Sequence, residues 1–137
     1  MNETGPRILQ PATWPRPRGY SNGIAVSGRQ IFVAGQVGWD AQEVFRSERL
    51  ADQVRQALEN ICAVLAQAQA GPEHVVRLTW FITSREEYYA ELAEIGAAYR
   101  AVMGKHFPVM SVVQVAALIE AHAKVEIEAT AVLCEEP

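Results

Sequence analysis

The segment KVEIEATAV, residues 124–132, alternates polar and apolar side chains over most of its length. This period of two predicts a β-strand with one buried face and one face that carries Glu126 and Glu128. The pattern alone leaves two interpretations open. Both carboxylates are solvated on the polar face of a sheet, or one of them is a partly buried acid that exchanges a proton with water or a substrate.

Hydrophobic periodicity in the chain before this strand predicts the remaining elements. In chain order these are strands over 21–27 and 30–37, a helix over about 47–70, a strand over 75–83, a helix over 84–104, and strands over 109–117 and 123–133. Gly28 and Arg29 suit the tight turn of a hairpin between the first two strands. Ser84 and Glu87 form a capping-box pattern that opens the second helix, and Gly104 ends it.

The order ββαβαββ predicts an α+β domain in which two helices cover one face of a mixed sheet. A hairpin at each end makes neighbouring strands antiparallel, which excludes an all-parallel doubly wound sheet. No further helix remains for the other face of the sheet, so another copy of the chain is its simplest cover. The hydrophobic content of 50% agrees with self-association.

The length of 137 residues fits one domain. Residues 11–19, PATWPRPRG, contain three prolines and do not suit regular structure. We therefore expect residues 1–19 to form an irregular N-terminal arm and residues 20–137 to form the single domain.

Composition argues against several kinds of partner and site. The net charge of −4, with scattered Lys and Arg, argues against nucleic acid as the main ligand. No apolar run approaches the length that crosses a membrane. Cys62 and Cys134 lie far apart and indicate reduced thiols in a cytoplasmic protein. His74, His106 and His122 have no carboxylate or cysteine at ligand spacing, so no metal site is expected.

Two segments resemble a known family. GYSNGIAVSGRQIFVAGQVGWD, residues 19–40, resembles an N-terminal Tyr-Ser strand that leads to a Ser/Ala-Gly-Gln turn. FPVMSVVQVAALIEAHAKVEIEATAV, residues 107–132, resembles a C-terminal signature in which Pro-x-Arg-Ser precedes a Val-Glu-Ile-Glu-Ala strand. Both are similar to the Rid (reactive intermediate deaminase) family, also called the YjgF family, over residues 17 to 133.

The resemblance implies a chorismate-mutase-like subunit and a homotrimer with small-molecule clefts between adjacent subunits. It also implies hydrolysis of enamines and imines, such as 2-aminoacrylate, to 2-oxo acids and ammonia. In that chemistry an arginine of the Pro-x-Arg-Ser element holds the substrate carboxylate, and the first glutamate of the last strand positions water. No cofactor is expected, because an imine is already electrophilic.

The family pattern carries over to Tyr20, Gly35, Ser111 and Glu126. The resemblance implies that Glu126 is the candidate catalytic residue. It fails at Met110, which stands where the arginine is expected. Losing a guanidinium clamp from a desolvated pocket costs on the order of 2–5 kcal/mol. Methionine is apolar and flexible, which suits the wall of a pocket for a less polar ligand.

Three further residues bear on the ligand. Arg18 lies on the proline-rich arm, so its guanidinium is a candidate replacement for the missing clamp, against the commoner reading of a solvated arginine. Trp39 follows the Gly-Gln turn and is either a packing residue or an apolar lid. Gly96 stands where many family members carry a ligand-binding asparagine.

These features favour a Rid-family protein that binds a small metabolite, with deamination of an atypical imine as the leading activity. The alternatives are a non-catalytic ligand-binding or chaperone-like trimer and, less favoured because of the acidic charge, a ribonuclease.

Overall fold

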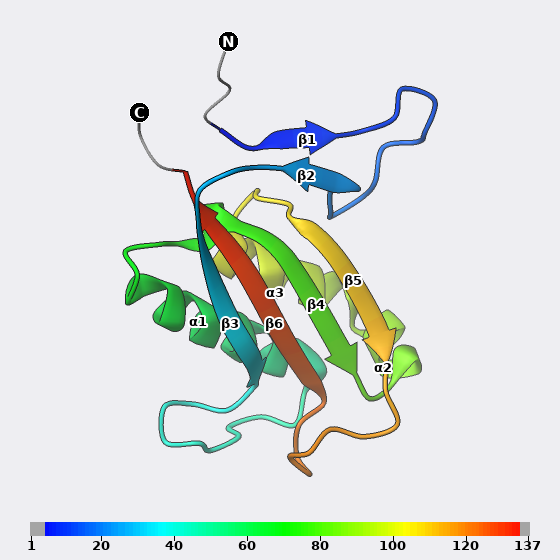
Figure 1. The fold of residues 1–137 in the computed structure, drawn as a ribbon. Coiled ribbons are helices and arrows are strands. Elements are labelled where there is room, and N and C mark those ends of the chain that lie inside the picture. Colours follow the sequence, from blue (N-terminus) through cyan, green and yellow to red (C-terminus); the bar gives the residue numbers. More distant parts are fainter. Residues whose placement is uncertain (1–4, 135–137) are drawn as a thin grey trace.

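The computed structural model describes residues 5–134 (Figure 1). Its strands are β1 (Arg7–Leu9), β2 (Gly23–Ala25), β3 (Arg29–Val37), β4 (Val75–Ile82), β5 (Val109–Gln114) and β6 (Val125–Leu133). Its helices are α1 (Leu50–Ala66), α2 (Arg85–Ala90) and α3 (Leu92–Met103), and a 3-10 turn, η1 (Pro72–His74), precedes β4. The predicted arm and domain also include residues 1–4 and 135–137, which lie outside the described residues.

Four strands form the main sheet in the order β3, β6, β4, β5. β6 is antiparallel to both of its neighbours, and β4 and β5 are parallel. Figure 1 shows α1 and α3 behind one face of this sheet, with the other face free of helices in the described chain. The prediction of an α+β fold with a mixed sheet and helices on one face is confirmed.

Alternation along β6 decides which of its side chains enter the core. Val125, Ile127 and Ala129 face the helices, and none is more than 4% exposed. Glu126 and Glu128 therefore lie on the opposite face, which we call the outer face of the sheet. The largest fully buried apolar side chains are Leu50, Leu58, Ile61, Leu65, Leu78 and Ile127. Each contributes about 1.5–3 kcal/mol on burial. Because Leu50, Leu58, Ile61 and Leu65 are on α1, the contact of this helix with the sheet is a main source of stability.

Both predicted hairpins are wrong. At the C-terminal end, β5 and β6 are not neighbours, because β4 lies between them and pairs with β5 in parallel. At the N-terminal end, the first two predicted strands do not pair with each other either. β2 pairs with β1 in a separate two-stranded sheet, and β3 pairs with β6. The reason lies just before β2, where Ser21 forms a bridge with Val109 on β5. β5 and β3 are opposite edges of the sheet, so the chain must cross between them (Figure 1). The predicted irregular arm likewise contains one regular element, β1.

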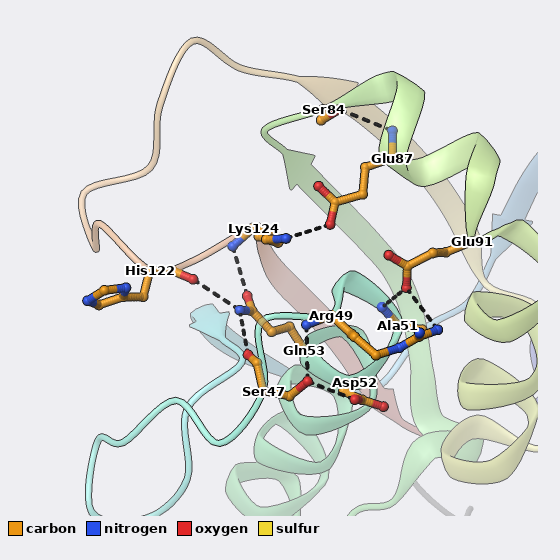
Figure 2. Close-up of polar contacts among 10 residues, drawn as sticks. All are labelled: Ser47, Arg49, Ala51, Asp52, Gln53, Ser84, Glu87, Glu91, His122 and Lys124. Atoms are coloured by element: carbon orange, nitrogen blue, oxygen red, sulfur yellow. Dashed lines mark hydrogen bonds and ion pairs between the residues drawn. The ribbon is translucent and has the colours of Figure 1, made fainter.

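The predicted second helix is divided into α2 and α3 at Glu91, whose φ of −108° and ψ of 19° are not helical. The capping position is as predicted, because the Ser84 hydroxyl accepts a hydrogen bond from the Glu87 N–H at 3.1 Å. At the break, the Glu91 carboxylate accepts a hydrogen bond from the Ala51 N–H at 3.0 Å (Figure 2). The break therefore places a carboxylate at the N-terminus of α1, where the helix dipole favours negative charge.

A buried glutamine joins α1 to the start of β6. Gln53 is 1% exposed, and its Nε2 donates to the carbonyl oxygens of Ser47 and His122, both at 3.0 Å. Its Oε1 accepts from the Lys124 N–H at 2.8 Å, and the Lys124 Nζ pairs with Glu87 at 2.7 Å. Figure 2 shows these bonds converging from α1, α2 and the segment before β6. They fix the chain two residues before Glu126.

Candidate functional site

A pocket of about 630 Å³ lies between α2, α3, β5 and the end of the N-terminal arm. We call it the α3–β5 pocket. Its lining residues are Arg18, Gly19, Tyr20, Trp80, Tyr88, Leu92, Ile95, Gly96, Tyr99, Arg100, Phe107, Met110 and Val112. Four of the residues singled out from the sequence thus lie in one pocket: Arg18, Tyr20, Gly96 and Met110. Its size and apolar lining suit a small-molecule ligand.

Ser21 fixes the arm against β5 and so positions the preceding pocket residues, Gly19 and Tyr20. Its hydroxyl donates a 2.6 Å hydrogen bond to the carbonyl oxygen of Phe107, and its N–H donates to that of Pro108 at 3.0 Å. Ser21 is 8% exposed, which makes these bonds shielded from water. Gly19, with a φ of +80°, turns the chain immediately before Tyr20.

Aromatic rings form one wall of the α3–β5 pocket. Tyr99 lies between Trp80 and Phe107, with ring centroids 6.4 Å and 6.3 Å away. The Tyr99 hydroxyl donates to the carbonyl oxygen of His106 at 2.7 Å, and burial raises the pKa of Tyr99. Burial, and then the neighbouring Tyr89, also raises the pKa of Tyr88. Both phenols therefore stay protonated at neutral pH and serve as walls or donors.

Two polar features remain at this wall. The indole N–H of Trp80 is buried and has no hydrogen-bond partner within the described residues. Arg100 lies one helical turn after Gly96, and a Cβ added to Gly96 would be 3.3 Å from the Arg100 Nη1. The absence of a side chain at Gly96 therefore leaves room for this guanidinium.

Glu126 and Gly35 form a second group, on the outer face of the sheet. The Glu126 carboxylate lies over Gly35, where an added Cβ would be 2.8 Å from the Glu126 Cδ. The pairing of β3 with β6 shifts register between Val33 and Gln36, which brings Gly35 to this position. Glu126 is half-buried, and no described residue forms an ion pair with it.

The two groups lie on opposite faces of the sheet in one chain. Met110 and Ala129 are both paired with Leu78, so Met110 and Glu126 are two strand spacings and three residues apart. These separations correspond to roughly 10 Å across and 10 Å along the sheet. Met110 packs against the core on the helix side, whereas Glu126 faces outward. One ligand does not touch both side chains of the same chain.

Ser111 and Trp39 do not line the α3–β5 pocket and do not contact Glu126. Ser111 follows Met110 on β5 and is exposed in a second hollow, which it shares with Arg77 and Thr79 and also with Tyr20 and Met110. Trp39 is half-buried beyond the end of β3, with its ring centroid 5.7 Å from that of Phe45. Its carbonyl oxygen accepts a 2.8 Å hydrogen bond from Asn60.

Sequence reasoning missed Trp80, Tyr99, Arg100 and Phe107 as pocket residues. The alternation of β4 indicates only that Trp80 is buried, and helical spacing indicates the same for Tyr99. For Arg100 a signal existed: it stands four residues after Gly96 and therefore on the same side of the helix. The four-residue spacing indicates a pocket residue only once the structure places β5 opposite α3.

The described residues contain no group of three or more His, Cys, Asp or Glu side chains arranged to hold a metal ion. Cys62 and Cys134 are free thiols, and burial, followed by the charges of Glu73 and Glu59, raises the pKa of Cys62. Within residues 5–134 no helix has both the length and the apolar character needed to cross a membrane.

Comparisons with known proteins agree on one family. Residues 13–133 match the family model described as endoribonuclease L-PSP. The RutC family protein slr0709 of Synechocystis is 35% identical over 135 residues, which cover 93% of this chain and 96% of that protein. The 2-iminobutanoate/2-iminopropanoate deaminase of Salmonella typhimurium is 32% identical over 116 residues, which cover 82% of this chain and 86% of that protein. The crystal structure of YyfB from Yersinia pestis is described as that of a Rid-family protein of unknown function. It superposes on this chain with a TM-score of 0.78 and is 35% identical in sequence, over 93% of this chain and 98% of that chain.

Proposed function

Because the chain belongs to the endoribonuclease L-PSP family, also called the Rid or YjgF family, we propose that it hydrolyses a reactive imine or enamine in a cleft between two subunits of a homotrimer. The observation that carries this proposal is the separation of the candidate residues onto two faces of the sheet. The α3–β5 pocket has apolar walls and cations but no carboxylate among its lining residues. Glu126 lies on the other face and reaches such a pocket only in a neighbouring copy.

The exposed outer face supports this assembly. Phe32 on β3 is 73% exposed there, and Val113 on β5 is 44% exposed. These side chains lie on the two edge strands of the sheet, and exposed apolar side chains gain free energy when a second copy covers them. A trimer in which each outer face meets the pocket side of the next subunit would use every copy of both groups once.

The proposed chemistry needs one carboxylate and one water molecule. Glu126 accepts a proton from water as the water oxygen attacks the carbon of the C=N bond. The resulting tetrahedral intermediate receives that proton on nitrogen, which gives a carbon that carries one hydroxyl and one amino group. Glu126 then transfers the hydroxyl proton to the amino nitrogen as the C–N bond breaks, so ammonia leaves and a carbonyl group remains. Backbone donors near Gly35 and Ser111 orient the ligand. The sum is imine plus water giving an oxo compound plus ammonia.

Because of Met110, we expect the preferred substrate of this protein to differ from 2-aminoacrylate. The name of the Salmonella relative describes deamination of small 2-imino acids by that protein. In the present chain Met110 offers no hydrogen-bond donor from β5, and the pocket wall is aromatic. We therefore expect higher kcat/KM for an imino acid with a bulky apolar side chain than for 2-aminoacrylate.

The test measures release of 2-oxo acid from 2-aminoacrylate and from a bulkier imino acid. The parent should prefer the bulkier substrate, and Glu126→Gln should lower kcat by about 10²–10⁴-fold because the general base is lost. Met110→Arg should shift the preference at least about tenfold toward 2-aminoacrylate, since a guanidinium binds a carboxylate directly. Gly35→Ala should also lower kcat, because its Cβ displaces the Glu126 carboxylate.

Glu128→Gln is the matched control. It removes the other outer-face carboxylate of the same strand and should leave kcat unchanged within about twofold. Full activity in Glu126→Gln would refute the assignment of the base. If the parent hydrolyses no imine and Met110→Arg becomes active, the second candidate holds: a ligand-binding trimer without turnover, which Met110 itself favours.

A further inference from the structure

Positive charge in the α3–β5 pocket has no partner within residues 5–134. Arg18 and Arg100 are the charged members of its described lining, and no carboxylate lines it. Neither guanidinium forms an ion pair with a described residue. Two like charges around one apolar hollow raise the local concentration of anions, so this pocket favours a ligand with an anionic group.

Both arginines are exposed, and they differ in how firmly the fold holds their backbones. Arg18 follows Pro17 in the arm, outside any helix or strand. Arg100 projects from α3, whose neighbouring residues Tyr99 and Met103 are in the core. Its Nη1 would lie 3.3 Å from a Cβ at position 96. A side chain at this position would therefore crowd the guanidinium, and glycine leaves space for it beside the helix. A donor held on a packed helix loses less freedom on binding than one on an irregular arm.

The remaining surface of the pocket suits an apolar body. Trp80, Tyr99 and Phe107 form the aromatic wall, and Met110 is adaptable enough to pack against rings of different shape. The Trp80 N–H has no partner within the described chain, but its nitrogen is buried, so Trp80 contributes the apolar surface of its ring to this wall.

We infer that Arg100 binds the carboxylate of the ligand, in place of the donor that β5 lacks at Met110, and that the ligand is a small acid with an aromatic or similarly bulky apolar group. This inference rests on the proposed function for the assignment of the α3–β5 pocket as the substrate site. Arg100 is thereby a specificity-determining residue, which selects acids through charge while the aromatic wall selects bulk.

Equilibrium binding tests the inference without turnover. The probe is 3-phenylpropanoate, and its neutral isostere is 3-phenylpropanamide, both titrated into the full-length protein by calorimetry. Arg100→Gln should raise the Kd for the acid at least about tenfold, because a charge-assisted bidentate pair is lost. Arg100→Lys should recover part of this loss, since it keeps the charge without the planar fork.

Two comparisons separate a pocket contact from a general charge effect. Lys105→Gln removes an exposed cation that does not line the pocket, and it should leave the Kd for the acid unchanged. The amide should bind the parent and Arg100→Gln with equal Kd. Equal Kd values for the acid in the parent and Arg100→Gln would overturn the inference, as would an effect of similar size in Arg18→Gln with none in Arg100→Gln.

Failure of this inference and failure of the proposed function have different signatures. If binding depends on Arg100 but no imine is hydrolysed, the ligand class stands and the enzyme proposal fails. If hydrolysis depends on Glu126 but acid binding ignores Arg100, the enzyme proposal stands and Arg100 has no role in recognition.

Discussion

Two glycines make room for the side chains on which the proposed site depends. Gly35 leaves space for the Glu126 carboxylate, and Gly96 leaves space for the Arg100 guanidinium. Gly35 was predicted from the family pattern, and Gly96 was noted only as a departure from it. The contact of Gly96 with Arg100 follows from their four-residue spacing on one helix. The contact of Gly35 with Glu126 does not follow from spacing, because it depends on the register of β3 against β6.

At the residue scale, we expect a substitution of Gly96 by alanine to raise the stability of the fold and to weaken ligand binding. Gly96 lies inside α3, where alanine is favoured by about 0.8–1.0 kcal/mol. The new Cβ would touch only a flexible guanidinium, so Gly96→Ala should raise the free energy of unfolding in urea by about 0.5–1 kcal/mol. It should also displace Arg100 and weaken acid binding.

Gly38→Ala is the control for that substitution. A Cβ at Gly38 would lie 2.6 Å from the Cα of Gln53, which is backbone and has no room to yield. This variant should be clearly destabilised. A loss of stability in Gly96→Ala comparable to that in Gly38→Ala would show that position 96 is packed tightly and that Arg100 does not occupy open space.

At the element scale, the sequence predicts elements better than their junctions. The predicted strands over 75–83, 109–117 and 123–133 correspond to β4, β5 and β6, because alternation and a buried face are local properties. The break at Glu91 was missed, since apolar spacing continues through Ile95 and Tyr99. Its cause is tertiary: the Glu91 carboxylate accepts from the N-terminus of α1.

The polar cluster around Gln53 yields a stability prediction at this scale. Gln53→Leu keeps the approximate volume but leaves Lys124 N–H and two carbonyl oxygens without their partner. Each unsatisfied buried group costs about 1–3 kcal/mol, so the free energy of unfolding should fall by at least about 2 kcal/mol.

Urea unfolding followed by circular dichroism measures this change. Gln67→Leu, at the exposed C-terminal end of α1, is the matched control and should change stability by less than about 0.5 kcal/mol. A neutral Gln53→Leu would mean that water replaces the glutamine and that the cluster does not hold the segment before β6.

At the scale of the whole molecule, the fold class was predictable and the course of the N-terminal segment was not. Two short β-prone runs around Gly28 suit a hairpin locally, yet Ser21 bonds to the far edge of the sheet. The division of the candidate site between two faces follows from alternation of β5 and β6 once their register is known. Sequence spacing gives the faces of single strands but not which strands are neighbours.

This division makes assembly a requirement of the proposed chemistry. The pocket of one copy and Glu126 of another must meet, so the protein should be a trimer in solution by light scattering, and a purely monomeric protein should be inactive. In the proposed trimer, each site therefore takes its pocket from one chain and its base from the next.

Mixed trimers test this claim most directly. Glu126→Gln keeps the pocket and lacks the base, whereas Gly96→Phe keeps the base and fills the pocket; each variant alone should be inactive. Co-expressed in equal amounts, they should regain about a quarter of parental imine hydrolysis, because half of the pockets are intact and half of these face an intact Glu126. If the mixed trimers form and show no activity above that of the separate variants, while the parent is active, the site lies within one chain and the account is contradicted.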